Sequence, residues 1–189
     1  MATAARQSGS MTLEEFLLRP DEKPYREYID GRIEVKVSPR RTHSIIEHDL
    51  ISSLNRNAKP TRTGRAYGEL RCTFAGRSIV PDIVFLRAEN DDYDDQNRKD
   101  DLVSVPPDIH VEIISQGQSA AATRKKLRHS TSHGSAIGWF IFPEDRKIEV
   151  YRGGELSMTL QIGDVLAAEP ALPGFKLPVE EIFGWLKPS

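Results

Sequence analysis

The alternation of apolar and polar positions near the start of the chain predicts a short helix followed by a hairpin. Residues 12–15 (TLEE) have the form of a capping box, so a helix is expected to begin there and to end before Pro20. Residues 25–30 alternate in the manner of a strand, and Asp30-Gly31 is a strong signal for a tight turn into a second strand over 32–37.

A longer amphipathic helix is predicted over residues 44–58, because Ile46, Leu50, Ile51 and Leu54 recur at helical spacing. The same reasoning predicts strands over 66–74, 79–86 and 109–114, a helix over 119–130, a meander of strands over 137–142, 147–152 and 155–161, and a closing helix over 178–186. This mixed order predicts an α/β or α+β fold, with one mixed sheet flanked by helices. Residues 1–10 are expected to be a disordered tail, and 11–189 a single domain.

Composition narrows the classes of function. The 189 residues are 38% apolar and 29% charged, which predicts a soluble globular protein, and a net charge of −2 excludes nucleic-acid binding by bulk positive charge. Cys72 is the single cysteine, which favours a reducing compartment. Residues 1–10 lack the apolar centre of a signal peptide, and the longest apolar run, 137–142, is too short to cross a bilayer. We therefore expect a cytoplasmic protein without membrane contact. The acidic run 90–95 is expected to be solvated rather than metal-binding.

Two carboxylates interrupt apolar segments that are predicted to be strands: Asp82 within 78–86 and Glu112 within 109–115. A buried, unpaired carboxylate is costly, so each needs a partner. If the two strands are neighbours, both side chains can point at one spot, where Mg²⁺ would take one or two carboxylates and keep several waters. A lysine close by would orient a bound water or offset charge on a phosphate. The alternative is that Asp82 accepts backbone hydrogen bonds and Glu112 pairs with a lysine or arginine.

Glu47 is a further candidate, with two competing interpretations. On the helical wheel it falls between Ile51 and Leu54, inside the apolar arc, which would aim it at the core side. Residues 44–47 (SIIE) also match a capping box, which would keep Glu47 on the N-terminus of its own helix. His43 would then lie just outside the helix, either structural or in contact with substrate. Glu69, before Asp82 in the chain, is a weaker candidate.

Several short segments occur in a specific order and spacing. They are 25–31 (YREYIDG), His43 ahead of the amphipathic helix, 80–84 (VPDIV), 111–115 (VEIIS), Lys126 at fourteen residues after Glu112 (126 − 112), and 172–175 (LPGF). Together they resemble the PD-(D/E)XK nuclease superfamily, and more closely a bacterial restriction endonuclease-like family that is common in cyanobacteria. The resemblance covers about residues 11–183.

The resemblance implies a restriction endonuclease-like core that hydrolyses phosphodiester bonds of DNA with Mg²⁺, or with Mn²⁺ in its place. It assigns Asp82 and Glu112 as metal ligands, with the backbone carbonyl of Ile113 as the third. In the usual motif the catalytic lysine stands two residues after the second acid, a position held here by Ile114. The resemblance implies that Lys126, on the following helix, takes its place.

Lys125 is the less suitable lysine, since it points about 100° away from Lys126 on a helix. Glu47 would match the acid that some superfamily members carry on the first core helix, and a homodimer is expected by analogy only. The chain departs from the family around its catalytic lysine, at Gln116, at 120–122 (AAA) and at Ser130, where the family usually has an aromatic residue.

Three functions are therefore weighed. The first is a metal-dependent DNA endonuclease, with Asp82, Glu112 and Lys126 as its catalytic residues. The second is a catalytically weak or inactive module of the same fold that binds nucleic acid or a protein partner. The third is a hydrolase of another phosphate ester. Positive charge for a phosphate backbone would come from Arg40, Arg41, Arg62, Arg65, Arg124, Lys125 and Arg128.

Overall fold

The computed structural model describes residues 11–93 and 102–187, so the predicted tail 1–10 and the end of the acidic run lie outside the described residues. The helices are α1 (Leu13–Leu17), α2 (Arg41–Thr61), α3 (Ala120–Ser132) and α4 (Val179–Gly184). The strands are β1 (Arg26–Ile29), β2 (Arg32–Val35), β3 (Gly64–Gly68), β4 (Cys72–Phe74), β5 (Arg77–Ile79), β6 (Ile83–Arg87), β7 (Ile109–Ile113), β8 (Ile137–Phe142), β9 (Lys147–Arg152), β10 (Glu155–Leu160), β11 (Val165–Ala167) and β12 (Lys176–Pro178).

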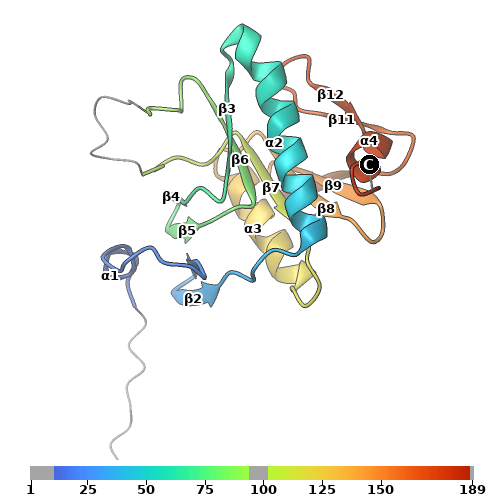
Figure 1. Ribbon diagram of the computed structural model, residues 1–189. Coiled ribbons are helices and arrows are strands. Elements are labelled where there is room, and N and C mark those ends of the chain that lie inside the picture. Colours follow the sequence, from blue (N-terminus) through green and yellow to red (C-terminus); the bar gives the residue numbers. More distant parts are fainter. Residues whose placement is uncertain (1–10, 94–101, 188–189) are drawn as a thin grey trace, which may run out of the picture.

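A six-stranded sheet in the order β10-β9-β8-β7-β6-β3 forms the centre of the molecule (Figure 1). Its neighbouring strands are antiparallel except for β7 and β8, which are parallel and are joined by α3. A parallel pair needs such a crossover connection, because a tight turn cannot join two strands that run the same way. A second sheet, β2-β1-β5-β4, lies beside the end of the large sheet from which β6 begins, and β11 and β12 form a two-stranded ribbon.

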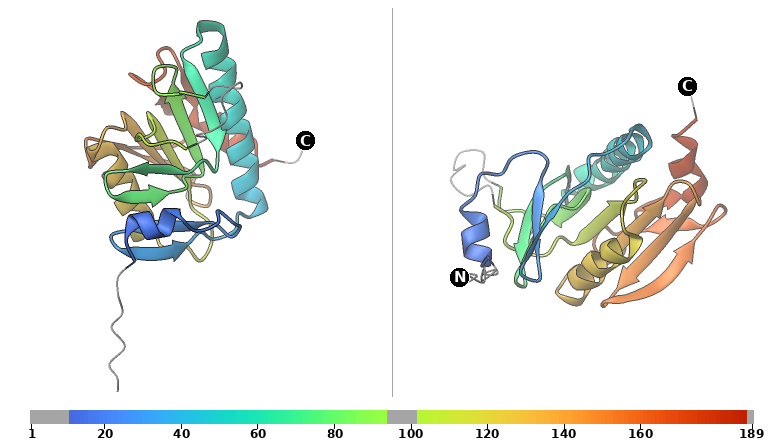
Figure 2. Two further views of the ribbon diagram at one scale, coloured as in Figure 1. Left: turned by 90° about the vertical axis from the view of Figure 1, so that its left-hand side faces the viewer. Right: turned by 90° about the horizontal axis from the view of Figure 1, so that it is seen from below.

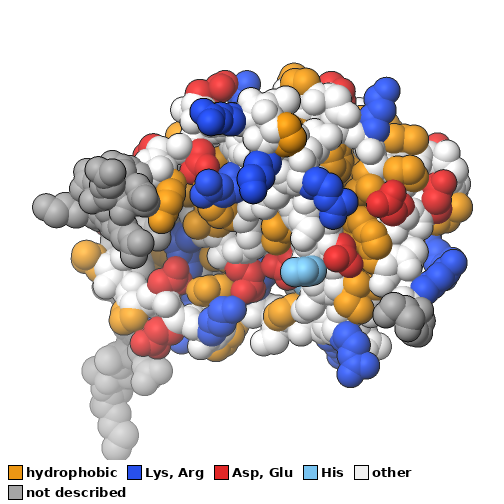
Figure 3. Space-filling model, turned by 45° about the horizontal axis from the view of Figure 1, so that its top comes forward, with side chains coloured by type: hydrophobic (Ala, Val, Ile, Leu, Met, Phe, Trp, Pro, Cys, Tyr) orange, Lys and Arg blue, Asp and Glu red, His pale blue; other side chains and the backbone are white. Residues whose placement is uncertain are grey.

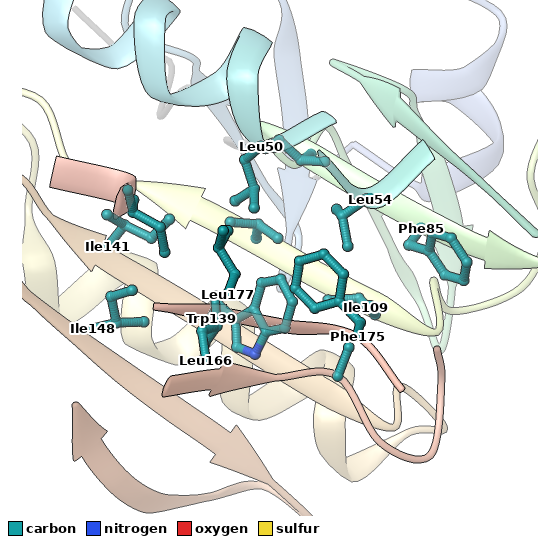
Figure 4. Packing of buried hydrophobic residues seen from close by; sticks show 14 of the residues in the cluster. Leu50, Leu54, Phe85, Ile109, Trp139, Ile141, Ile148, Leu166, Phe175 and Leu177 are labelled. Atoms are coloured by element: carbon teal, nitrogen blue, oxygen red, sulfur yellow. The ribbon is translucent and has the colours of Figure 1, made fainter. Parts of the chain in front are cut away.

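Helices cover both faces of the large sheet, with α2 and α4 on one side and α3 on the other (Figure 2). The main core lies under α2, where Leu50 and Leu54 pack toward Ile109 and Trp139 of the sheet (Figure 4). The predicted mixed sheet flanked by helices is therefore confirmed. No helix within 11–93 or 102–187 has both the length and the apolar character needed to cross a membrane.

The local signals near the start of the chain are confirmed. Thr12 caps α1, with its hydroxyl accepting from the Glu15 amide and the Glu15 carboxylate accepting from the Thr12 amide. Asp30 and Gly31 both have positive φ, 51° and 78°, in the two-residue turn between β1 and β2. The predicted meander is also present as β8, β9 and β10.

The strands predicted over 66–74 and 79–86 are wrong as continuous elements, because each divides between the two sheets. The first breaks at Glu69, which has a φ of 49°, and the second breaks at residues 80–82. Pro81 explains the second break, since it has no amide hydrogen to give to a strand ladder. Asp82 thus stands in a bend before β6 rather than inside a strand.

The main helix begins three residues earlier than predicted, and this decides between the two interpretations of Glu47. The N-cap is Arg40, without a side-chain cap, so the capping box over residues 44–47 is wrong. Glu47 lies in the second turn and His43 lies inside α2, not before it. Both side chains are therefore carried by the helix toward the sheet.

Candidate active site

The candidate site forms where the chain passes from the small sheet into the large one. In the antiparallel pair of β6 and β7, Ile83 lies opposite Val111, so the next step of the same register places Asp82 opposite Glu112. Side chains opposite one another in such a pair have Cβ atoms roughly 5 Å apart. Beyond this point the chain leaves β7 for the small sheet. Glu112 lines a cavity of about 170 Å³ that residues of the β1–β2 hairpin and of α3 also line, whereas Asp82 is buried outside it.

Asp82 is almost fully buried, and its two oxygens have different surroundings. Oδ2 accepts a hydrogen bond of 2.7 Å from the backbone N–H of Ile113. Oδ1 lies 2.8 Å from Lys36 Nζ, close enough for an ion pair but poorly aligned for a hydrogen bond. Among the described residues Oδ1 accepts no well-formed hydrogen bond, so it is the oxygen of this carboxylate that is open to another ligand.

Glu112 is buried with two cationic or polar partners on one oxygen. Its Oε1 lies 2.9 Å from His110 Nε2 and 2.9 Å from Lys126 Nζ. Burial by itself raises the pKa of a carboxyl group, but the Lys126 ammonium and the His110 hydrogen bond outweigh it, so the pKa of Glu112 is lowered from its ordinary value. Glu112 is therefore an ionised carboxylate at neutral pH.

Lys126 reaches this point from α3 and bridges two acids. Besides Glu112, its Nζ donates to both oxygens of Glu27, at 3.2 and 3.1 Å. Burial alone lowers the pKa of a lysine, but the carboxylates of Glu112 and Glu27 reverse the effect and raise the pKa of Lys126. The structure thus brings Asp82, Glu112 and Lys126 to one place, with Lys126 on the same side of the sheet as Glu112.

Two residues of the site, Glu27 and Lys36, were missed as candidates by sequence reasoning. Glu27 is 4% exposed and also accepts a hydrogen bond of 2.8 Å from the Val80 amide. Lys36 has a side chain that is 7% exposed and donates to the Val80 carbonyl at 2.8 Å. The sequence signal was one charged residue on each strand of the predicted hairpin. It points to the site only once the hairpin is known to pack against Asp82.

His43 and Glu47 approach Asp82 from α2. His43 Nδ1 lies 3.2 Å from Ser115 Oγ, and Nε2 lies 3.5 Å from Asp82 Oδ1 and 3.7 Å from Glu47 Oε2. Burial raises the pKa of Glu47, and the neighbouring acids add to the effect. Gly68 makes room for this side chain, since a Cβ there would lie 2.9 Å from Glu47 Oε1.

The charges around Asp82 and Glu112 do not balance. Five carboxylates face three ammonium groups, which leaves two negative charges when all are ionised. The carboxylates are those of Glu27, Glu47, Glu69, Asp82 and Glu112, and the ammonium groups are those of Lys23, Lys36 and Lys126. A surplus of two negative charges is the electrostatic condition that favours a divalent cation.

Comparison with known proteins identifies the family of the chain. Residues 13–180 match the model of the Uma2 family, which is described as "Putative restriction endonuclease". The chain belongs to the Uma2 family. The resemblance found in the sequence is thereby confirmed.

A crystal structure supports the same conclusion. It is that of "a putative nuclease belonging to DUF820" from Anabaena variabilis ATCC 29413, which is 32% identical and superposes with a TM-score of 0.88 over 94% of this chain and 99% of that one. A cryo-EM structure of a DrdV–DNA complex matches 77% of this chain and 14% of that chain at 12% identity, and its TM-score of 0.37 is too low to carry an argument. No curated protein matches the chain.

The departures from the Uma2 pattern do not displace Lys126. Helix α3 forms over Ala120–Ser132 despite its alanine-rich first turn, with Ser119 as N-cap accepting from the Ala122 amide. Ser130 Oγ lies 2.7 Å from His110 Nδ1, so the residue that replaces the usual aromatic side chain is itself bonded to the network around Glu112.

Two of the basic residues considered for DNA contact are occupied in ion pairs. Arg124 donates to both oxygens of Glu149, at 2.9 and 2.7 Å, and Arg128 lies 2.8 Å from Glu155. Arg40 differs, since it contacts the Gln116 side chain at the rim of a cavity of about 460 Å³ that His43 also lines. On the face shown in Figure 3, basic, acidic and apolar side chains are interspersed.

Proposed function

We propose that this member of the Uma2 family is an endonuclease that hydrolyses phosphodiester bonds of DNA with the help of Mg²⁺, for which Mn²⁺ can substitute. The observation that supports this most strongly is the convergence of Asp82, Glu112 and Lys126 at the point where β6 separates from β7. The family description, "Putative restriction endonuclease", favours DNA as the class of substrate.

The residues present fit a divalent cation. Asp82 Oδ1 is buried and lacks a well-formed hydrogen bond among the described residues. Ile113 donates its N–H to Asp82, and in a strand the N–H and C=O of one residue point to the same side, so its carbonyl faces the acids too. Within 11–93 and 102–187 no three His, Cys, Asp or Glu side chains form a ready cluster for a metal. Two carboxylates, a carbonyl and several waters suit Mg²⁺, which rarely uses an all-protein cage.

A bound Mg²⁺ supplies a water of lowered pKa and polarises a phosphate oxygen. The chain's own groups then have distinct tasks. Asp82, Glu112 and the Ile113 carbonyl would hold the cation. Lys126 keeps an ammonium group beside Glu112, where it would orient the attacking water and offset charge on the phosphate. Glu27 fixes Lys126 through two hydrogen bonds, which makes Glu27 a positioning residue.

His43 and Glu47 belong to the same site in this proposal. His43 contacts Ser115 and lies 3.5 Å from Asp82 Oδ1, so it borders the proposed cation site on the α2 side. Glu47 adds negative charge at a place where burial makes ionisation unfavourable, an arrangement that serves binding rather than stability. DNA would approach along the cavity that Arg40 and His43 line. A homodimer, with one site for each strand, and a cytoplasmic location remain predictions.

The test compares wild type with Asp82→Ala on supercoiled plasmid and single-stranded DNA in Mg²⁺, Mn²⁺ or EDTA. Cleavage that needs the cation and disappears in the variant supports the proposal, whereas equal cleavage by both proteins exposes contamination. If neither cuts, calorimetric titration with Mn²⁺ follows, with Asp82→Asn as the variant. Cation binding that Asp82→Asn abolishes would then direct the search to another phosphate ester.

The second candidate function, a module that binds nucleic acid or a protein partner without cutting, is favoured by the near-neutral charge and by the departures at Gln116 and residues 120–122. It predicts DNA binding in EDTA that Asp82→Asn leaves unchanged and no dependence on Mn²⁺. The position of Lys126 beside Glu112 favours the enzyme.

A further inference from the structure

Lys36 lies beside the Asp82 oxygen that a bound cation would use. It follows directly after β2, its side chain is 7% exposed, and its Nζ donates to the Val80 carbonyl at 2.8 Å. The same Nζ lies 2.8 Å from Asp82 Oδ1. Burial lowers the pKa of Lys36, but the carboxylates of Asp82 and Glu112 more than compensate, so the pKa of Lys36 is raised and the group is an ammonium ion.

Asp82 has one oxygen to offer, and Lys36 is already beside it. Oδ2 is bonded to the Ile113 amide, which leaves Oδ1 for a metal ion. Mg²⁺ binds a carboxylate oxygen at roughly 2.1 Å, so an ammonium group that stayed on the same oxygen would lie only a few ångströms from the ion. Repulsion between the two at such a separation is strong in a buried site. A divalent cation and Lys36 therefore compete for Asp82.

A second acceptor for Lys36 lies within reach. Glu69 Oε1 is 4.0 Å from Lys36 Nζ, while Lys23 holds the other oxygen, Oε2, at 2.8 Å. Glu69 is fixed in place because its amide donates to the Asp82 carbonyl at 3.1 Å, and its φ of 49° is unusual for a glutamate. A cavity of about 270 Å³, lined by Lys36, Glu69 and Tyr25 among others, gives the lysine side chain room to move.

We propose that Lys36 is an internal counter-ion that a divalent cation displaces from Asp82 to Glu69. This inference rests on the proposed cation site at Asp82. In the absence of the cation Lys36 neutralises Asp82 and keeps its carboxylate aligned. When the cation binds, the ammonium group moves to Glu69 Oε1. Because an ammonium group must be displaced, the site selects divalent over monovalent cations and has a lower affinity than its carboxylates alone would give.

The test measures Mn²⁺ affinity by calorimetric titration in wild type, Lys36→Met and Lys36→Gln. Both variants remove the competing charge, and Lys36→Gln keeps a donor for the Val80 carbonyl. We expect Mn²⁺ to bind at least about tenfold tighter in these variants, since even a partly screened unit charge at this distance costs a decade in affinity. Lys59→Met is the matched control, because Lys59 is exposed near the C-terminal end of α2, many residues along the helix from His43, and we expect a change below about twofold.

Thermal unfolding gives a second readout that a merely structural lysine would not produce. In EDTA the Lys36 variants should unfold at a lower temperature than wild type, because Asp82 loses its partner. Added Mn²⁺ should raise their midpoint by more than it raises that of wild type. Mn²⁺ affinity in Lys36→Met that is equal to or weaker than in wild type overturns the inference, whatever happens to stability.

Glu69→Gln tests whether the Lys36 ammonium group moves to Glu69, because this variant keeps the lysine and removes its proposed acceptor. It should weaken Mn²⁺ binding at least about threefold in wild type and much less in the Lys36→Gln background, because only the first protein needs the acceptor. Equal effects in both backgrounds argue against the transfer. If wild type binds no Mn²⁺, or if binding survives Asp82→Asn, the proposed cation site fails together with this inference. Binding that Asp82→Asn abolishes but Lys36→Met does not tighten refutes this inference alone.

Discussion

His110 Nε2 lies 2.9 Å from Glu112 Oε1, two residues along the same face of β7. Because Glu112 is ionised, it accepts, and the proton between them belongs to Nε2. Nδ1 of a neutral imidazole is then an acceptor, and the Ser130 hydroxyl, 2.7 Å away, donates to it. The orientation of the carboxylate at the candidate site thus depends on a serine of α3.

Ser130→Ala should lower the free energy of unfolding by about 1 to 3 kcal/mol, because it leaves a buried imidazole nitrogen without its hydrogen bond. Urea unfolding followed by circular dichroism measures this change. Ser132→Ala is the control, since Ser132 is exposed on the same helix. Equal effects at the two positions would show that the bond to His110 contributes nothing.

Acid should destabilise the protein through Glu112. Its pKa is lowered by folding, so the unfolded chain takes up the proton more readily, and the stability from this group is present above the ordinary glutamate pKa and lost as pH falls below it. The free energy of unfolding should therefore decline from about pH 5 downward in wild type and less steeply in Glu112→Gln. Glu180→Gln, an exposed change on α4, should keep the wild-type slope.

Glu47→Gln should stabilise the protein in EDTA by about 1 kcal/mol, as replacements of strained functional residues often do. Burial raises the pKa of Glu47, so the fold disfavours the charged form that prevails at neutral pH, and a neutral isostere removes that cost. The same variant should weaken Mn²⁺ binding. A loss of stability in EDTA would contradict this account of Glu47.

We expect Arg124 to contribute to stability and Arg40 to contribute to DNA binding. Arg124→Gln leaves the buried carboxylate of Glu149 without its guanidinium, so it should cost about 1 to 3 kcal/mol of stability and leave DNA affinity within about twofold of wild type. Arg40→Gln should weaken DNA binding and reduce its salt dependence by about one counterion. Fluorescence anisotropy in EDTA at several salt concentrations measures the DNA affinity of both variants, and urea unfolding measures the stability of Arg124→Gln. Weaker DNA binding in Arg124→Gln but not in Arg40→Gln would redirect the search for the DNA surface.

Much of the fold was predictable because its signals are local. The turn at Asp30-Gly31, the capping box at Thr12 and the apolar periodicity of α2 each depend on neighbours within a few residues. Asp82 and Glu112 were also recognisable, because a carboxylate in an apolar segment is unusual and the spacing to Lys126 is that of a known family.

The remainder depended on contacts between distant segments. Glu27 and Lys36 are on a hairpin whose alternation looks like that of any half-exposed strand pair, and only the packing of the small sheet against Asp82 buries them. The early start of α2 gave no periodic signal either, because its first turn is polar and Arg40 provides no side-chain cap.

The pairing of Glu27 with Lys126 joins residues 99 positions apart in the chain. The acids, the lysines and the histidines of the site come from the hairpin of β1 and β2 with the residue after it, from α2, from the bend before β6, from β7 and from α3, so a chain still being synthesised lacks the site until α3 has emerged and packed. If the site cuts DNA as proposed, a fragment or a half-folded intermediate cannot do so. Completion of folding would then be the step that brings the proposed activity into being, and a truncated copy that ends before Lys126 would lack it.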